Sequence, residues 1–133
     1  MKKKNSIVQR RKVKFDNQYL EDPKIEKIYL IFKKQLYLQI KNEKFCIGVS
    51  GGPDSLALAF LAKIFSKEFN SKFVALIIDH NLRKQSGTEA RKVKKILTEH
   101  KIKAKILTWK GKIPKSNIQF NARNIRYFLL NKE

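Results

Sequence analysis

The sequence predicts an α/β fold in which a doubly wound parallel sheet carries helices on both faces. Three short apolar runs, at residues 44–49, 72–79 and 103–109, have the continuous hydrophobicity of strands that are buried on both sides. Each run is followed by a segment with helical periodicity, and this alternation is typical of doubly wound sheets. The chain has 133 residues, 42% of them hydrophobic, which is enough for the core of one such domain.

A further helix is predicted before the first strand, over residues 23–43. Pro23 suits the first turn of a helix, where the missing N–H costs no hydrogen bond. Apolar residues then recur at three- and four-residue spacing, which places on one face Ile25, Ile28, Tyr29, Phe32, Leu36 and Ile40. Residues 1–22 are predicted to form a basic tail, and residues 44–133 the α/β domain itself.

The helices after the strands are predicted over residues 53–65, 86–100 and 116–130. The last two begin with a serine that is followed three residues later by Glu89 or Gln119, which is the spacing of a capping box. Cys46, the one cysteine of the chain, lies inside the first predicted strand and is expected in the core. A single cysteine excludes a disulfide within the chain.

The charge of the chain points to a polyanionic partner. There are 31 Lys and Arg against 11 Asp and Glu, a formal net charge of +20 at pH 7. This excess favours nucleic acid first and an anionic membrane surface second, while a lysine-rich drift in composition is the alternative source of the charge. No apolar run approaches the ~20 residues of a membrane span, and the N-terminus lacks a signal-peptide core. We therefore expect a cytoplasmic protein with no membrane partner.

The loop "SGGPDS" joins the first predicted strand to the next helix. Its six residues are Ser50, Gly51, Gly52, Pro53, Asp54 and Ser55. The glycines can adopt positive φ and let a ligand approach the backbone, and the proline sets φ for the first helical residue. Free N–H groups at the helix N-terminus, with the serine hydroxyls, would then cradle a phosphate. The alternative is a structural turn, but the agreement of six residues between a strand and a helix favours the phosphate interpretation.

Asp54 is the unexpected member of this loop. A carboxylate beside bound phosphates repels them unless a cation lies between the two. Asp54 therefore indicates either a Mg²⁺ ion at the site or a side chain that holds the loop by bonds to its own amides.

Two further groups of polar residues are candidates for the site. Just past the second predicted strand, on the ligand-binding rim, lie Asp79, His80, Asn81 and Arg83. His80 would orient ATP or a base there, or simply shape the turn by bonding to nearby backbone. Arg123 and Arg126 are three residues apart on the last helix and can share a face. The alternative for the two arginines is a solvated basic surface.

The loop resembles the signature of the PP-loop ATP pyrophosphatases, which cleave ATP to AMP and pyrophosphate. Two more segments, "IIDHNLRKQSGTEA" at 77–90 and "WKGKIPKSNIQFNARNIRY" at 109–127, look like the catalytic domain of bacterial tRNA(Ile)-lysidine synthetases. The resemblance covers about residues 44–130. It implies an adenine nucleotide alpha-hydrolase-like fold, binding of ATP and Mg²⁺, and catalytic roles for Asp54 and Arg123, with His80, Asn81 and Arg126 near the nucleotide or the tRNA.

The resemblance also implies a reaction, a carbon–nitrogen bond-forming ligation. ATP adenylates the carbonyl of the wobble cytidine in an isoleucine tRNA with a CAU anticodon, and the amine of free L-lysine then displaces AMP. Synthetases of this family continue beyond the last matched segment, so we expect the domain to be incomplete at its C-terminus and a partner segment to supply the rest. The alternatives are a non-catalytic nucleotide- or RNA-binding remnant, or another PP-loop tRNA-modifying enzyme such as a thiolase. A buried Cys46 would argue against the thiolase.

Overall fold

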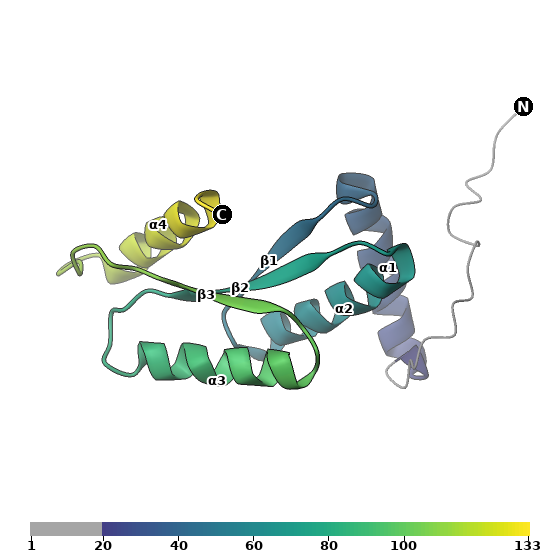
Figure 1. Ribbon diagram of the computed structural model, residues 1–133, viewed down its shortest axis with the longest axis horizontal. Helices are drawn as coiled ribbons and strands as arrows, with labels where there is room; N and C mark the ends of the chain where they lie inside the picture. Colours follow the sequence, from purple (N-terminus) through teal and green to yellow (C-terminus); the bar gives the residue numbers. More distant parts are fainter. Residues whose placement is uncertain (1–19) are drawn as a thin grey trace, which may run out of the picture.

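The structure is a computed structural model that describes residues 20–133 (Figure 1). The elements of this part of the chain are, in order, α1 (Pro23–Ile40), β1 (Phe45–Val49), α2 (Pro53–Phe69), β2 (Phe73–Asp79), α3 (Ser86–Glu99), β3 (Ala104–Thr108) and α4 (Ile118–Asn131). Each predicted helix and strand is present, with ends shifted by a few residues. Most of the predicted basic tail, 1–22, lies outside the described residues.

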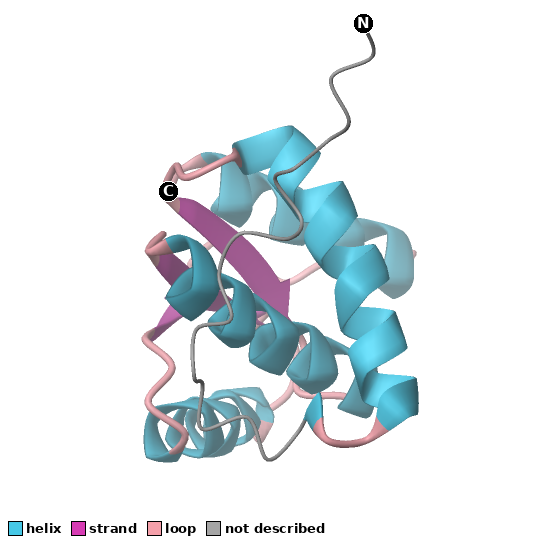
Figure 2. Ribbon diagram, turned by 90° about the vertical axis from the view of Figure 1, so that its right-hand side faces the viewer, coloured by secondary structure: helices cyan, strands magenta, loops and turns pink. Residues whose placement is uncertain are grey.

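The three strands form one parallel sheet in the order β1-β2-β3. Phe45 pairs with Phe73, and Ala75 pairs with Ala104. Helices α2 and α3 lie on one face of the sheet and α4 lies on the other (Figure 1). The turned view shows the strands enclosed between helices (Figure 2). The predicted α/β class with helices on both faces is therefore confirmed.

The main core lies between the sheet and helices α2 and α3. Its fully buried members are Val49, Ala59, Ala75, Ile77, Ala90, Leu97 and Ile102. Alanines at the contact points let the helix backbones approach the strands closely, while the larger side chains fill the space between them. This packing fixes the direction of β1 and β2, whose carboxyl ends carry the loops of the candidate site.

Helix α1 packs against α2 with most of the predicted face, because Tyr29 is buried and Phe32, Leu36 and Ile40 are half-buried. The exceptions are Ile25 and Ile28, which are exposed, and Lys33, which is buried. The Lys33 ammonium pairs with the Glu68 carboxylate, and the Tyr29 hydroxyl donates to the same carboxylate. The polar contact with Glu68 on α2 thus orients α1, and it draws a lysine into a position that the hydrophobic pattern assigned to solvent.

Burial and Glu68 also affect the ionisation of Tyr29. Burial, the hydrogen bond to Glu68 and the charge of Glu68 all raise the pKa of Tyr29 above its ordinary value. The hydroxyl consequently keeps its proton at physiological pH and remains a donor to Glu68.

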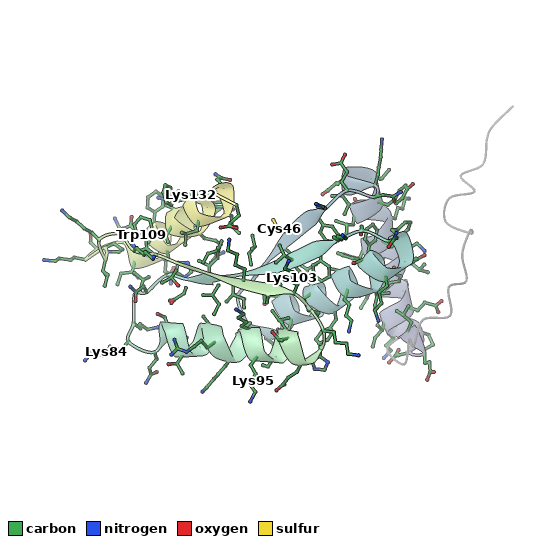
Figure 3. The ribbon with its side chains drawn as sticks, in the orientation of Figure 1. Cys46, Lys84, Lys95, Lys103, Trp109 and Lys132 are labelled. Atoms are coloured by element: carbon green, nitrogen blue, oxygen red, sulfur yellow. The ribbon has the colours of Figure 1, made fainter. Side chains whose placement is uncertain are left out.

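Cys46 is exposed, so its predicted place in the core is wrong. Its neighbours in β1, Phe45 and Ile47, turn toward the core, and a strand directs successive side chains to opposite faces. Cys46 therefore projects from the other face of the sheet, where α4 leaves the side chain open to solvent (Figure 3).

The two predicted capping boxes are absent. The Ser86 hydroxyl donates to the Arg83 carbonyl, and Glu89 pairs with the Arg83 guanidinium. Helix α4 begins only at Ile118, after Asn117 in a left-handed conformation with no side-chain cap. Local spacing therefore identified the helices but not the contacts that begin them.

Within residues 20–133, none of the helices combines the length and the apolar character needed to cross a membrane.

Candidate functional site

A cavity of about 400 Å³ opens at the carboxyl ends of β1 and β2. Its volume is in the range of small-ligand sites, which commonly measure ~300–1,000 Å³. Polar residues of its lining are Ser50, Ser55, His80, Arg83, Ser86, Glu89 and Arg126. The sheet thus brings together the loop after β1, the loop after β2, the first turns of α2 and α3 and one residue of α4, at the edge where parallel sheets bind ligands.

Gly51, in the loop after β1, occupies a position that requires glycine. Its φ of +95° lies in the region that side chains rarely adopt. A Cβ at this position would also stand 2.4 Å from Cγ2 of Val93 on α3. Both the backbone turn and the close approach of α3 therefore require glycine.

Gly52 is under no such constraint and does not use the positive φ that was expected to be open to both glycines. It is the N-cap of α2 with φ −70° and ψ 163°, an extended conformation open to other residues. The nearest atom to a Cβ here is the Ser50 hydroxyl at 3.7 Å, an ordinary contact. Gly52 therefore leaves open space beside the helix N-terminus.

The two serine hydroxyls hold the loop in shape. Ser55 Oγ accepts from the Gly51 N–H at 3.1 Å and donates to the Gly52 carbonyl at 3.0 Å. Ser50 Oγ lies 3.1 Å from Ser55 Oγ. The amides of Asp54 and Ser55 lie in the first turn of α2, where the helix itself offers no acceptor. These amides and the positive end of the helix form the cradle for an anion.

The Asp54 side chain is exposed in the first turn of α2. No group of three or more His, Cys, Asp or Glu residues gathers as a metal site within residues 20–133. Mg²⁺ commonly takes one or two carboxylates and completes its shell with water and substrate phosphates. A single carboxylate beside an anion cradle therefore fits a cation that arrives with phosphates.

His80 lines the cavity with an unsatisfied ring nitrogen. Its Nε2 is buried and has no hydrogen-bond partner among the described residues. Burial lowers the pKa of His80, and the charge of Arg126 acts in the same direction, against a backbone hydrogen bond at Ala122 and the charge of Asp79. The imidazole is therefore neutral at pH 7, with one nitrogen left for a ligand.

The two arginines of α4 have different surroundings. Arg126 lines the cavity, and within the described residues it has no ion-pair partner. Arg123 does not line the cavity and instead lies over the ring of Tyr127, at 5.7 Å from its centroid. The catalytic role of Arg123 stays a prediction, and its position outside the cavity does not support that role.

Asn81 shapes the loop after β2. It adopts φ +53°, its N–H donates to Asp79 Oδ1 at 2.9 Å, and its side-chain amide donates to the Trp109 carbonyl at 3.4 Å. These bonds join the ends of β2 and β3. Asn81 is not part of the cavity lining, so its expected contact with a ligand stays a prediction.

Sequence reasoning missed two polar residues of the lining, Ser86 and Glu89, which were assigned to a helix cap. Arg83, which was expected on the ligand-binding rim without a specific role, also lines the cavity. The Arg83–Glu89 ion pair at 3.0 Å leaves neither charge alone in the wall. The available signal for Ser86 and Glu89 was their position in the helix that follows the ligand edge of a parallel strand.

Comparison with known proteins gives consistent matches. The family model of the PP-loop domain matches residues 24–133, a region that includes α1. The chain is 42% identical over 105 residues to a tRNA(Ile)-lysidine synthase of Bartonella quintana, covering 77% of this chain and 22% of that protein. It is 37% identical over 100 residues to the same enzyme of Bradyrhizobium diazoefficiens, covering 73% of this chain and 28% of that protein. This chain thus spans about a fifth to a quarter of the relatives' length.

The fold also matches a solved structure, the U34-tRNA thiolase of Methanococcus maripaludis with its [4Fe-4S] cluster. The TM-score is 0.63 at 22% identity, over 80% of this chain and 42% of that one. At this identity the likeness concerns the fold alone. The glycine loop, the parallel sheet and the family match agree, and this chain belongs to the PP-loop family.

Proposed function

We propose that this chain is the ATP-binding part of a tRNA(Ile)-lysidine synthetase. The observation that carries the proposal is the placement of the "SGGPDS" loop, whose free helix N-terminus borders a cavity with an unpaired His80 nitrogen and an unpaired Arg126. Identity of about 40% to lysidine synthases over most of the chain supports this choice within the family. The chain spans about a fifth of the length of these relatives. We therefore expect the whole reaction to need further segments in addition to this chain.

The cavity and the helix N-terminus beside it would together hold the phosphates and the base of ATP. The amides of Asp54 and Ser55 would receive phosphate oxygens, and the Arg126 guanidinium would add positive charge where pyrophosphate departs. Val49, Ile77 and Leu82 give the lining an apolar part against which a base can lie. His80 Nε2 would make a hydrogen bond to the nucleotide or to the base of the tRNA.

The proposed chemistry explains why ATP is needed. The oxygen of cytidine is a poor leaving group, so an amine cannot displace it directly. Transfer of the adenylyl group to that oxygen releases pyrophosphate and makes AMP the leaving group. The amine of free lysine then forms the new carbon–nitrogen bond as AMP leaves. Mg²⁺ held by Asp54 would neutralise the phosphates during the first step. We expect the protein in the cytoplasm, with its tRNA.

The thiolase alternative receives less support from the site. Cys46 is exposed on β1 but is not part of the cavity lining, and a single cysteine cannot supply the ligands of a [4Fe-4S] cluster. Sulfur transfer by this chain would need thiols from outside it.

Exchange of labelled pyrophosphate into ATP tests the proposed reaction. We expect exchange that requires isoleucine tRNA with a CAU anticodon, when the chain is supplied with the remaining segment of a related synthetase. Added lysine should convert the adenylated tRNA to lysidine and release AMP. ATP binding without exchange under these conditions would contradict the ligase and favour a non-catalytic nucleotide-binding module.

Gly52→Val tests the phosphate cradle. Because φ at Gly52 suits any residue and a Cβ meets no close atom, the fold should persist while the added methyl groups fill the cradle. We expect ATP to bind at least ~10-fold more weakly by calorimetry, a loss of about 1.4 kcal/mol or more. Unchanged affinity in a folded variant would exclude a phosphate at this place.

Asp54→Asn separates the two interpretations of the acidic residue. If Asp54 acts through Mg²⁺, the variant should bind MgATP about tenfold more weakly, a loss of ~1.4 kcal/mol. Its affinity for ATP in the presence of a chelator should be unchanged or higher, because one negative charge is gone. Equal weakening with and without metal would mean that Asp54 holds the loop.

A further inference from the structure

A second hollow lies at the opposite end of the sheet from the glycine loop. It measures about 590 Å³ and is bordered by six lysines, namely Lys44, Lys63, Lys67, Lys72, Lys101 and Lys103. It lies at the amino ends of the strands, whereas the candidate nucleotide site lies at their carboxyl ends. Lys103 and Trp109, which flank β3, mark these two ends in Figure 3.

Three of these lysines form a row across the edge of the sheet. Lys44, Lys72 and Lys103 each immediately precede a strand, β1, β2 and β3 respectively. Because Phe45 pairs with Phe73 and Ala75 pairs with Ala104, Lys44 is level with Lys72, whereas Lys103 is level with Val74. The row therefore steps along the sheet by two residues between β2 and β3. The partial negative charge at the C-terminal ends of α2 and α3 explains why Lys67 and Lys101 lie there. It does not account for the row, whose members belong to no helix.

The positive charge of the hollow is not neutralised within residues 20–133. No aspartate or glutamate borders it, and the side chains of the three row lysines have no ion pair or hydrogen bond there. Lys63 donates to the His100 carbonyl at 2.5 Å, and its pKa is lowered by burial and by the charges of Lys67 and Lys101. Like charges are therefore crowded around this hollow.

A buried hydroxyl adds a second polar feature. Ser71 borders the hollow and is 6% exposed, and its Oγ has no hydrogen-bond partner among the described residues. An unpaired hydroxyl donor in a wall otherwise rich in ammonium groups is complementary to an anion with several oxygen acceptors.

We propose that this lysine-lined hollow binds the phosphate backbone of RNA. Lysine ammonium groups on flexible stems bind phosphates as point charges, whereas carboxylates are matched by the fork of arginine, and no arginine borders the hollow. A row of cations along a sheet edge suits a chain of phosphates better than one compact anion. Contacts of this kind position an RNA without reading its bases.

The identity of the RNA rests on the proposed function, because tRNA is the RNA that such an enzyme would hold. The surface does not rest on ATP binding, since the two hollows lie at opposite ends of the strands. RNA binding measured without ATP therefore tests the surface separately from the nucleotide site.

The test compares two triple variants of equal charge. Lys44→Gln/Lys72→Gln/Lys103→Gln removes the row, and Lys34→Gln/Lys92→Gln/Lys94→Gln removes three exposed lysines that border neither hollow. Binding of a fluorescent 20-nucleotide oligouridine is followed by anisotropy over a range of salt. Thermal melting and ATP titration show that both variants are folded.

The row variant should bind the oligouridine at least ~10-fold more weakly at physiological salt than the parent, and the control less than threefold. Three lost phosphate contacts should also lower the slope of log K against log salt by about 2, from ~0.7 for each contact to a single strand. The single change Lys72→Gln should lower affinity in the same direction. Equal losses in the two triple variants would mean that net charge alone binds RNA. Displacement of the RNA by inorganic tripolyphosphate at equal phosphate concentration would assign the hollow to a small anion and overturn the proposal.

Discussion

Gly51→Ala should lower the free energy of unfolding by about 2–5 kcal/mol, because two separate costs act at this position. At this position alanine would have to adopt φ +95°, a conformation that costs a residue with an L side chain ~1–2 kcal/mol. The Cβ also stands 2.4 Å from Val93 Cγ2, and overpacking of this kind costs ~1–3 kcal/mol. Urea denaturation of parent and variant measures the sum.

Gly52→Ala is the matched control for Gly51→Ala. It adds the same atom one residue later, where φ is ordinary and the nearest atom is 3.7 Å away, so stability should change by less than ~1 kcal/mol. The double variant Gly51→Ala/Val93→Ala removes the contact but keeps the backbone conformation. Its loss of unfolding free energy should be smaller than the sum of the losses in Gly51→Ala and Val93→Ala. Equal stability of Gly51→Ala and the parent would show that the loop does not have this conformation in solution.

Glu68→Ala should destabilise the protein by about 3–5 kcal/mol, because it leaves a buried lysine without its counter-ion. The side chains of Lys33 and Glu68 are only 11% and 14% exposed, and the Tyr29 hydroxyl loses its acceptor in the same variant. Thermal and urea denaturation should both report the loss, and α1 should detach from α2 first.

Two further variants distinguish the buried pair from an ordinary charge effect. Glu99→Ala breaks the exposed contact of 3.9 Å with Lys95 and should change stability by less than ~1 kcal/mol. Lys33→Met/Glu68→Leu replaces both partners by apolar groups and should recover most of the stability lost in Glu68→Ala. A loss in the double variant as large as in Glu68→Ala would assign the effect to the Tyr29 bond or to packing.

The fold was largely predictable because its signals are local. Continuous apolar runs and alternating helical segments indicate parallel strands and their crossovers without any knowledge of distant contacts. The faces were less predictable. Ile28 fits the apolar stripe of α1 but is 56% exposed, because the partner of α1 is a single helix whose Glu68 attracts Lys33. A hydrophobic pattern contains no information about a buried ion pair between residues 35 positions apart.

The candidate site was predictable in part. The position of the glycine loop followed from the strand and helix that flank it, and Ser50, Ser55, His80 and Arg126 do border one cavity. Arg123 and Asn81 do not border it, although their spacing along the chain is equally suitable. The difference lies in the directions in which the side chains point. The Arg123 guanidinium lies over Tyr127, and Asn81 binds the carbonyl of Trp109.

The sequence by itself determined the class of fold, the place of the anion loop and the basic character of the surface, because propensity, glycine and net charge act locally or additively. Only the tertiary structure decided that Gly51 rather than Gly52 is the constrained glycine, since the constraint comes from Val93 on another helix. It also decided that Lys44, Lys72 and Lys103 form one row. These lysines are dispersed along the chain, and the pairing of parallel strands brings them to the same edge.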